Sequence, residues 1–132
     1  MRDTRTFPHE AQSVPAARRF ATSVLRGASA STLEAIELMV SELATNCIRH
    51  TDSGFDLTII RDGPDIRVEA TDGAGGTPTM RSPKPTDESG RGLKIVDMLS
   101  ARWGVQPRAS AGKTVWFMIS DAGAPAGNPC RA

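Results

Sequence analysis

The chain has 132 residues, enough for one domain with a hydrophobic core of its own. Its 16 basic and 15 acidic residues leave a net charge of +1, which does not suggest nucleic acid or an anionic membrane as the main partner. Cys47 and Cys130 lack the spacing of a metal site, and no apolar run reaches the about 18 residues of a membrane span. We therefore expect a cytoplasmic protein with no membrane contact and no direct nucleic-acid partner.

The two ends of the chain differ in composition from its middle. Residues 1–12 are polar and are expected to form an arm that holds one short edge strand around Thr6 and Phe7. A folded domain is expected over residues 13–121. Residues 122–132 contain almost nothing to bury and are expected to form a loose tail.

Two helices are expected at the start of this domain. In the first, Ser13 is the expected N-cap and Gly27 the stop. The second is expected to begin with Ser31 or Thr32 as its N-cap and to end soon after His50. Apolar residues recur at helical spacing in both and predict one shared core: Ala17, Phe20, Ala21, Val24 and Leu25 in the first, and Ile36, Val40, Leu43, Ala44 and Cys47 in the second, with Met39 at the edge of that stripe.

Glu42 and Asn46 lie four residues apart in the second helix and therefore stand together at the shoulder of its apolar stripe. For an isolated pair, solvation on an amphipathic helix is the simpler interpretation. The alternative is catalytic. The Asn46 amide oxygen suits a Mg²⁺ ion that takes its other ligands from water and substrate phosphates. Glu42 would then be the general base for a hydroxyl that attacks a phosphate.

A β-hairpin is expected over residues 55–61 and 66–71. By the two-residue period of a strand, Asp72 continues the inward face of the second strand. A carboxylate in that place can accept a hydrogen bond from the exocyclic amine of a base, and Gly75 and Gly76 would let a flat ring approach the backbone. A turn-initiating Asp is an equally good interpretation.

A long segment rich in Gly, Pro and Ser, residues 73–90, comes after the hairpin and is typical of a lid or of disorder. It leads into the sequence SGRGL at residues 89–93, where Gly92 is expected to open a third helix. Free N–H groups at a helix start favour an anion such as a phosphate, but this pattern alone is weak evidence.

Two strands, over residues 102–107 and 114–120, are expected to complete the domain. Thr114 shares one strand face with Trp116 and Met118. Its hydroxyl needs a partner there, and a threonine with a satisfied hydrogen bond is the simpler interpretation.

Taken in order, four segments resemble the N, G1, G2 and final Thr boxes of the GHKL (Bergerat-fold) ATPase superfamily. They are ELATN at 42–46 with His50, DGAGG at 72–76, SGRGL at 89–93 and GKT at 112–114. The small size and the sequence ELATNCIRHT are similar to the single-domain anti-sigma factor serine kinases of bacteria. The resemblance implies an α/β two-layer sandwich with a mixed, largely antiparallel sheet, helices on one face, and ATP under a mobile lid.

The resemblance also implies roles for individual residues. Asn46 would hold Mg²⁺, Glu42 would be the catalytic base and Asp72 would bind the adenine amine. The ATP site would be completed by Gly76, Ser89, Gly90, Arg91, Gly92, Leu93 and Thr114. The family phosphorylates a serine of an anti-anti-sigma protein of the STAS type and, in the other state of its switch, sequesters a sigma factor. A homodimer is also consistent with this family.

Two positions depart from the family pattern. Ala74 stands where the G1 box usually has glycine, and Glu88 stands where some of these kinases have arginine, so that Arg91 or Lys84 is the candidate cation. Two functions therefore stay open. Glu42 together with the amide of Asn46 favours an active kinase. The two departures favour a non-catalytic module that sequesters a sigma factor or another regulator. Such a module would use ATP as a structural ligand or would bind no nucleotide.

Overall fold

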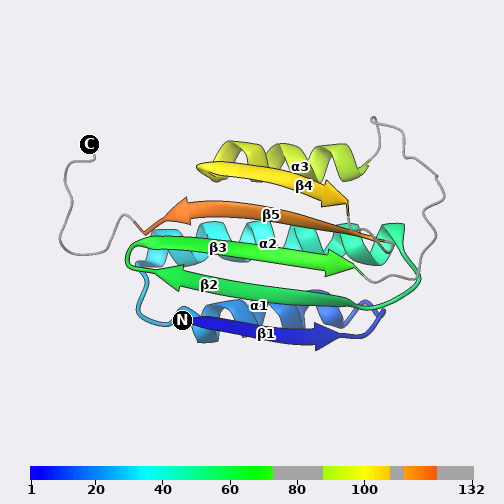
Figure 1. Cartoon of the computed structure of the whole chain (residues 1–132), viewed down its shortest axis with the longest axis horizontal. Helices are drawn as coiled ribbons and strands as arrows, with labels where there is room; N and C mark the ends of the chain where they lie inside the picture. Colours follow the sequence, from blue (N-terminus) through cyan, green and yellow to red (C-terminus); the bar gives the residue numbers. More distant parts are fainter. Residues whose placement is uncertain (73–87, 108–111, 122–132) are drawn as a thin grey trace.

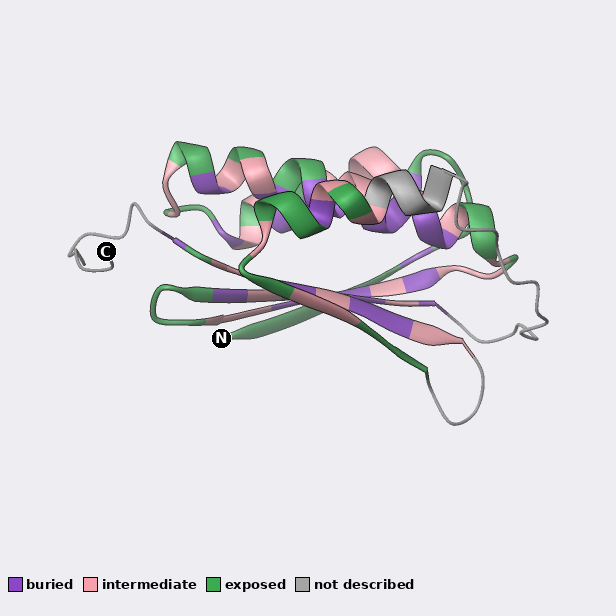
Figure 2. Ribbon diagram, turned by 90° about the horizontal axis from the view of Figure 1, so that it is seen from above, coloured by how far each residue is buried: buried purple, intermediate pink, exposed green. Residues whose placement is uncertain are grey.

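The computed structural model describes residues 1–72, 88–107 and 112–121, with residues 88–92 described by their backbone alone. The elements are β1 (Arg2–Phe7), α1 (Ser13–Val24), α2 (Ala30–His50), β2 (Phe55–Asp62), β3 (Asp65–Asp72), α3 (Glu88–Leu99), β4 (Arg102–Pro107) and β5 (Lys113–Ser120). Within these residues the five strands form one sheet in the order β1-β2-β3-β5-β4, and the three helices cover one of its faces (Figures 1 and 2).

This arrangement confirms the expected two-layer α/β sandwich. Each of the four strand pairings is antiparallel, so within the described residues the sheet is antiparallel throughout rather than mixed. The turn between β2 and β3 contains Gly63 at a φ of +64°, a left-handed conformation that glycine adopts without strain. No helix in the described part of the chain is long and apolar enough to cross a membrane.

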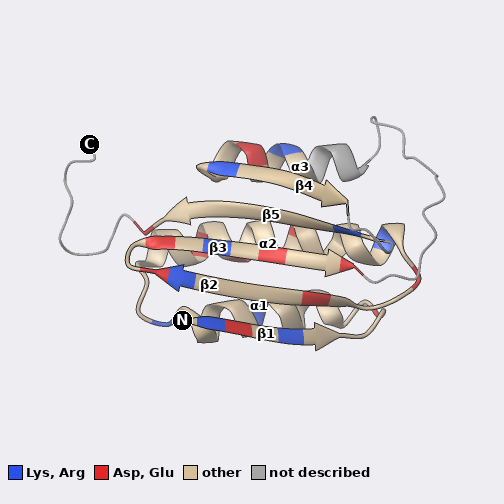
Figure 3. Ribbon diagram, in the orientation of Figure 1, with Lys and Arg blue, Asp and Glu red and all other residues tan. Residues whose placement is uncertain are grey.

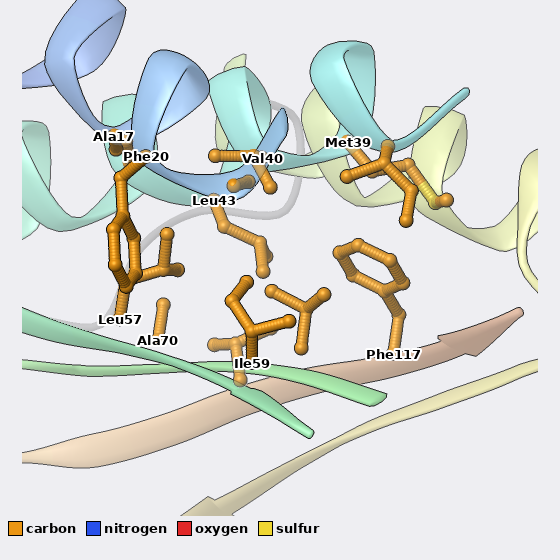
Figure 4. Packing of buried hydrophobic residues seen from close by; sticks show 14 of the residues in the cluster. Ala17, Phe20, Met39, Val40, Leu43, Leu57, Ile59, Ala70 and Phe117 are labelled. Carbon is orange, nitrogen blue, oxygen red and sulfur yellow. The ribbon is translucent and has the colours of Figure 1, made fainter. Parts of the chain in front are cut away.

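The core lies between α2 and the inner face of the sheet (Figure 4). The apolar stripe predicted for the second helix is buried, and Met39, which we expected at its edge, is fully buried as well. Side chains from alternate strand positions meet this stripe from below, as the two-residue period requires. Burial of each large side chain stabilises the fold by roughly 1.5–3 kcal/mol. The labelled contributors from the sheet are Leu57, Ile59, Ala70 and Phe117.

The first strand is longer than the short segment expected around Thr6 and Phe7. All six residues of β1 pair with β2, so much of the expected polar arm belongs to the sheet. The Phe7 ring anchors the end of β1. It stacks on Phe55 with ring centroids 5.4 Å apart and meets Phe20 edge-on with centroids 6.0 Å apart. These aromatic contacts fix β1 at the edge of the sheet.

Three expected element starts are corrected by the structure. Ser13 is the first residue of α1 rather than its N-cap, and its hydroxyl donates to the Pro8 carbonyl at 2.6 Å. The N-cap of α2 is Ser29, whose hydroxyl accepts the Thr32 N–H at 3.2 Å, and not Ser31 or Thr32. The helix α3 begins at Glu88, four residues before Gly92. Several residues at each site have the chemistry of a cap, so the sequence did not distinguish them.

A buried carboxylate just beyond β5 joins three parts of the fold. Asp121 is 3% exposed, and its Oδ1 accepts hydrogen bonds from the Ser29 N–H at 3.2 Å and from the Thr32 hydroxyl at 2.9 Å. Its Oδ2 pairs with the Arg61 guanidinium at 3.1 Å. Asp121 therefore holds the start of α2 against the ends of β2 and β5.

Replacement of Asp121 by alanine should lower the free energy of unfolding by about 2–4 kcal/mol, because buried donors on α2 lose their acceptor. Urea unfolding followed by circular dichroism measures this change. Asp65→Ala is the matched control, since Asp65 is exposed, and should change stability by less than about 0.5 kcal/mol. Equal effects of the two substitutions would show that Asp121 is not a structural link.

Candidate functional site

Asp72, whose carboxylate we predicted to point inward from the hairpin, lies at one end of the sheet. Asp72 ends β3 and Lys113 begins β5, and because these strands are antiparallel the two residues come together. Figure 3 shows the acidic end of β3 and the basic start of β5. Asp72 is 3% exposed, which confirms the inward orientation expected from the strand period. A buried carboxylate needs charge or hydrogen-bond partners, so its surroundings are informative.

Lys113 supplies both partners of this carboxylate. Its backbone N–H donates to Asp72 Oδ1 at 3.0 Å, and its ammonium Nζ lies 3.0 Å from Oδ2. The Asp72 side chain is 2% exposed and the Lys113 side chain is 33% exposed, so the lysine reaches from the solvent to a buried acid. Sequence analysis missed Lys113, although strand alternation in β5 places it on the same inward face as Val115 and Phe117.

Thr114 lies on the opposite face of the sheet from Asp72. It pairs in register with Thr71, and the two hydroxyl oxygens are 2.9 Å apart. Because Thr71 and Asp72 are consecutive residues of one strand, their side chains point to opposite faces. This register therefore fits the interpretation of Thr114 as a threonine with a satisfied hydrogen bond. It does not fit the expected role of Thr114 in supporting a base beside Asp72.

Asn46 and Glu42 occupy the shoulder of α2, as expected. Asn46 is 9% exposed, and its Oδ1 is the one buried side-chain oxygen or nitrogen in the described residues that lacks a hydrogen-bond partner. A buried acceptor without a donor costs about 1–3 kcal/mol. Glu42, one turn earlier, is half-buried, and no described residue forms a hydrogen bond or ion pair with its carboxylate.

These residues fit Mg²⁺ of the kind that is bound together with a nucleotide. No cluster of three acidic, histidine or cysteine side chains occurs in the described part of the chain, so a cage made by protein alone is not available there. Mg²⁺ commonly takes one or two protein oxygens and completes its shell with water and phosphate oxygens. The unpaired oxygen of Asn46 suits that role.

The thiol of Cys47 connects the helix to the ion pair. Burial, and to a smaller extent the negative charge of Asp72, raise the pKa of Cys47 from 9.0 to about 12, while the positive charge of Lys113 acts to lower it. Both charges therefore act on a side chain of α2, next to Asn46 in the chain. The site is thus formed by α2 above and by the joined ends of β3 and β5 below.

The glycine-bearing segment before Leu93 lies within α3 rather than in front of it. Since the helix begins at Glu88, residues Ser89, Gly90 and Arg91 fall in its first turn, where backbone N–H groups have no intrahelical acceptor. Such groups favour phosphate oxygens. Gly92 comes next in the same helix, and Leu93 packs against the core. The remaining expected contributor, Gly76, lies outside the described residues, as do Ala74 and Lys84.

The raised pKa of the Cys47 thiol makes the free energy of unfolding depend on pH. An unfolded thiol ionises near pH 9, whereas the folded Cys47 does so near pH 12, so its contribution to stability is complete below pH 9 and is lost as the pH rises toward 12. Two proteins are compared: the Cys130→Ala variant and the double variant that also carries Cys47→Ala. Above pH 9, the free energy of unfolding of the first should fall by about 1.4 kcal/mol per pH unit more than that of the second. Urea titrations at several pH values measure the difference, and parallel curves would contradict it.

Comparison with known proteins agrees with this geometry. Residues 7–119 match the family model of the histidine kinase-like ATPase domain. No curated protein matches the chain. The matched range spans most of the sequence, from the end of β1 through most of β5, and includes all the residues of the site described above. The chain therefore belongs to the histidine kinase-like ATPase family of the GHKL superfamily.

Proposed function

We propose that this protein is an ATP-dependent serine kinase and anti-sigma factor. The observation that carries the proposal is the buried amide oxygen of Asn46, which has no partner in the described residues and lies one turn from the carboxylate of Glu42. An uncompensated acceptor inside a fold points to a ligand that compensates it. Membership of an ATPase family supports a nucleotide with its metal ion as that ligand.

Each residue has one task in this proposal. Asp72 accepts a hydrogen bond from the base, and the first turn of α3 binds phosphate oxygens through its backbone N–H groups. Asn46 would hold Mg²⁺, and a bound Mg²⁺ would neutralise phosphate charge. Glu42 takes the proton from the serine hydroxyl as the serine oxygen bonds to the γ-phosphorus. The bond from that phosphorus to the β-phosphate oxygen breaks, and ADP leaves.

The partners are proposed from the resemblance to single-domain anti-sigma factor kinases. The serine belongs to an anti-anti-sigma protein of the STAS type, and the same domain sequesters a sigma factor in the cytoplasm. Lid ordering by the γ-phosphate would switch the domain between these partners. A homodimer is compatible with this function.

The ion pair between Asp72 and Lys113 favours a second function. In the structure the Asp72 carboxylate is already engaged by Lys113 through both oxygens, so the acceptor intended for a base has a competing partner. The departures at Ala74 and Glu88 favour the same alternative. It is a non-catalytic module that sequesters a sigma factor or another regulator, with ATP as a structural ligand or without nucleotide.

ATP binding is tested first. In the presence of Mg²⁺, isothermal titration calorimetry should give a dissociation constant in the micromolar range, and Asp72→Asn should weaken it by about tenfold or more because the carboxylate acceptor is lost. Asp65→Asn, at an exposed position of the same strand, is the control and should bind as the wild type does. Absence of ATP binding by a folded wild-type protein would reject the kinase and leave the nucleotide-independent module.

Catalysis is tested at Glu42. Glu42→Ala should reduce transfer of the γ-phosphate to a STAS-type protein by about 10²-fold or more while ATP binding is retained, because a general base supplies about 10²–10⁴-fold. Transfer of radiolabel from ATP measures the reaction, and calorimetry measures binding. Glu37→Ala, at an exposed position of α2, is the matched control. Normal transfer by the Glu42 variant would show that another group accepts the proton.

A further inference from the structure

Two charged side chains, Asp72 and Lys113, stand where the proposed function places the base. The Asp72 carboxylate can only accept hydrogen bonds, and the Lys113 ammonium can only donate them. Their charged ends lie 3.0 Å apart. The carboxylate is buried and the lysine is one-third exposed, so donor and acceptor stand next to each other at the border between core and solvent.

This pairing alters what the carboxylate alone would select. Adenine carries a donor at its 6-amino group and an acceptor at N1, whereas a 6-oxopurine such as hypoxanthine or guanine carries an acceptor at O6 and a donor at N1. A lone carboxylate favours the amine and repels O6. A carboxylate with an adjacent ammonium can serve both kinds of base. The 6-amine of adenine donates to Asp72, whereas a 6-oxopurine shifted by one ring position donates its N1–H to Asp72 and accepts from Lys113 at O6.

We propose that Lys113 is a specificity-determining residue, and that with Asp72 it allows this site to bind 6-oxopurine nucleotides as well as ATP. The inference rests on the proposed function, in which Asp72 receives the base. The backbone N–H of Lys113 occupies Oδ1, and the ammonium approaches Oδ2, which as a carboxylate oxygen can accept a second hydrogen bond.

The surroundings reinforce the role of Lys113. The neighbouring thiol of Cys47 is neutral at physiological pH and does not replace an ammonium. Thr114, the next residue, points to the other face of the sheet and has Thr71 as its partner. Among the described residues that contact Asp72, Lys113 is therefore the group that can stabilise a base oxygen.

Inosine triphosphate is the appropriate probe, because its base differs from adenine only at the C6 substituent and the N1 proton. Calorimetry with Mg²⁺ should give dissociation constants for ATP and ITP that agree within about tenfold for the wild type. Lys113→Ala should weaken ITP by about tenfold or more relative to ATP, since O6 then faces the carboxylate without a donor. Lys113→Arg should keep the wild-type ratio. Arg102→Ala removes one exposed positive charge at the other end of the β4–β5 pair and should also keep it.

The outcomes separate this inference from the proposed function. Tight ATP binding with ITP weaker by about 100-fold or more in the wild type would overturn the role of Lys113 and leave the ATP site intact. An equal loss of both nucleotides in Lys113→Ala would likewise overturn it, because the lysine would then serve the phosphates or the fold. If neither nucleotide binds the folded wild type, both proposals fail. Thermal unfolding checks each variant, and Lys113→Met, which keeps the aliphatic length, repeats the test if the alanine variant does not fold.

Discussion

The burial of one stripe of α2 against the inner face of the sheet positions every other feature of this protein. Leu43 and Cys47 are held in the core, and their burial orients the whole helix. Because residues four apart share a side, Glu42 and Asn46 are then carried to the shoulder, above the end of the sheet. The same packing brings α2 over the start of β5, where Lys113 and Asp72 meet.

Polar groups placed in that interior distinguish the candidate site from the rest of the fold. A buried amide oxygen without a donor and a buried carboxylate with a solvent-reaching lysine are costly for a fold that needs only stability. Asp121 contrasts with Asn46, since it is also buried but has donors from Ser29, Thr32 and Arg61. One end of the sandwich therefore carries a satisfied structural carboxylate, and the other end carries the Asn46 oxygen, an acceptor that a ligand would complete.

Family membership and local chemistry answer different questions about that ligand. The match to the histidine kinase-like ATPase domain accounts for a nucleotide and for the overall arrangement of helices on one face of the sheet. It does not specify how a particular chain treats the base. In the proposed site that selection would depend on the side chains at the ends of β3 and β5, where an ammonium adjoins the carboxylate. The sigma factor and its antagonist are proposed from resemblance and are independent of this contact.

The sequence by itself determined the features that follow from local periodicity. The α2 stripe, the hairpin and the inward direction of Asp72 repeat every 3.6 or two residues, and chain geometry alone dictates those periods. It did not determine which of several similar residues caps a helix, how far β1 extends, or where α3 begins. Nor did it reveal that Thr114 faces Thr71 while Lys113 meets Asp72. Those facts depend on the register of residues more than 40 positions apart, which only the packed tertiary structure decides.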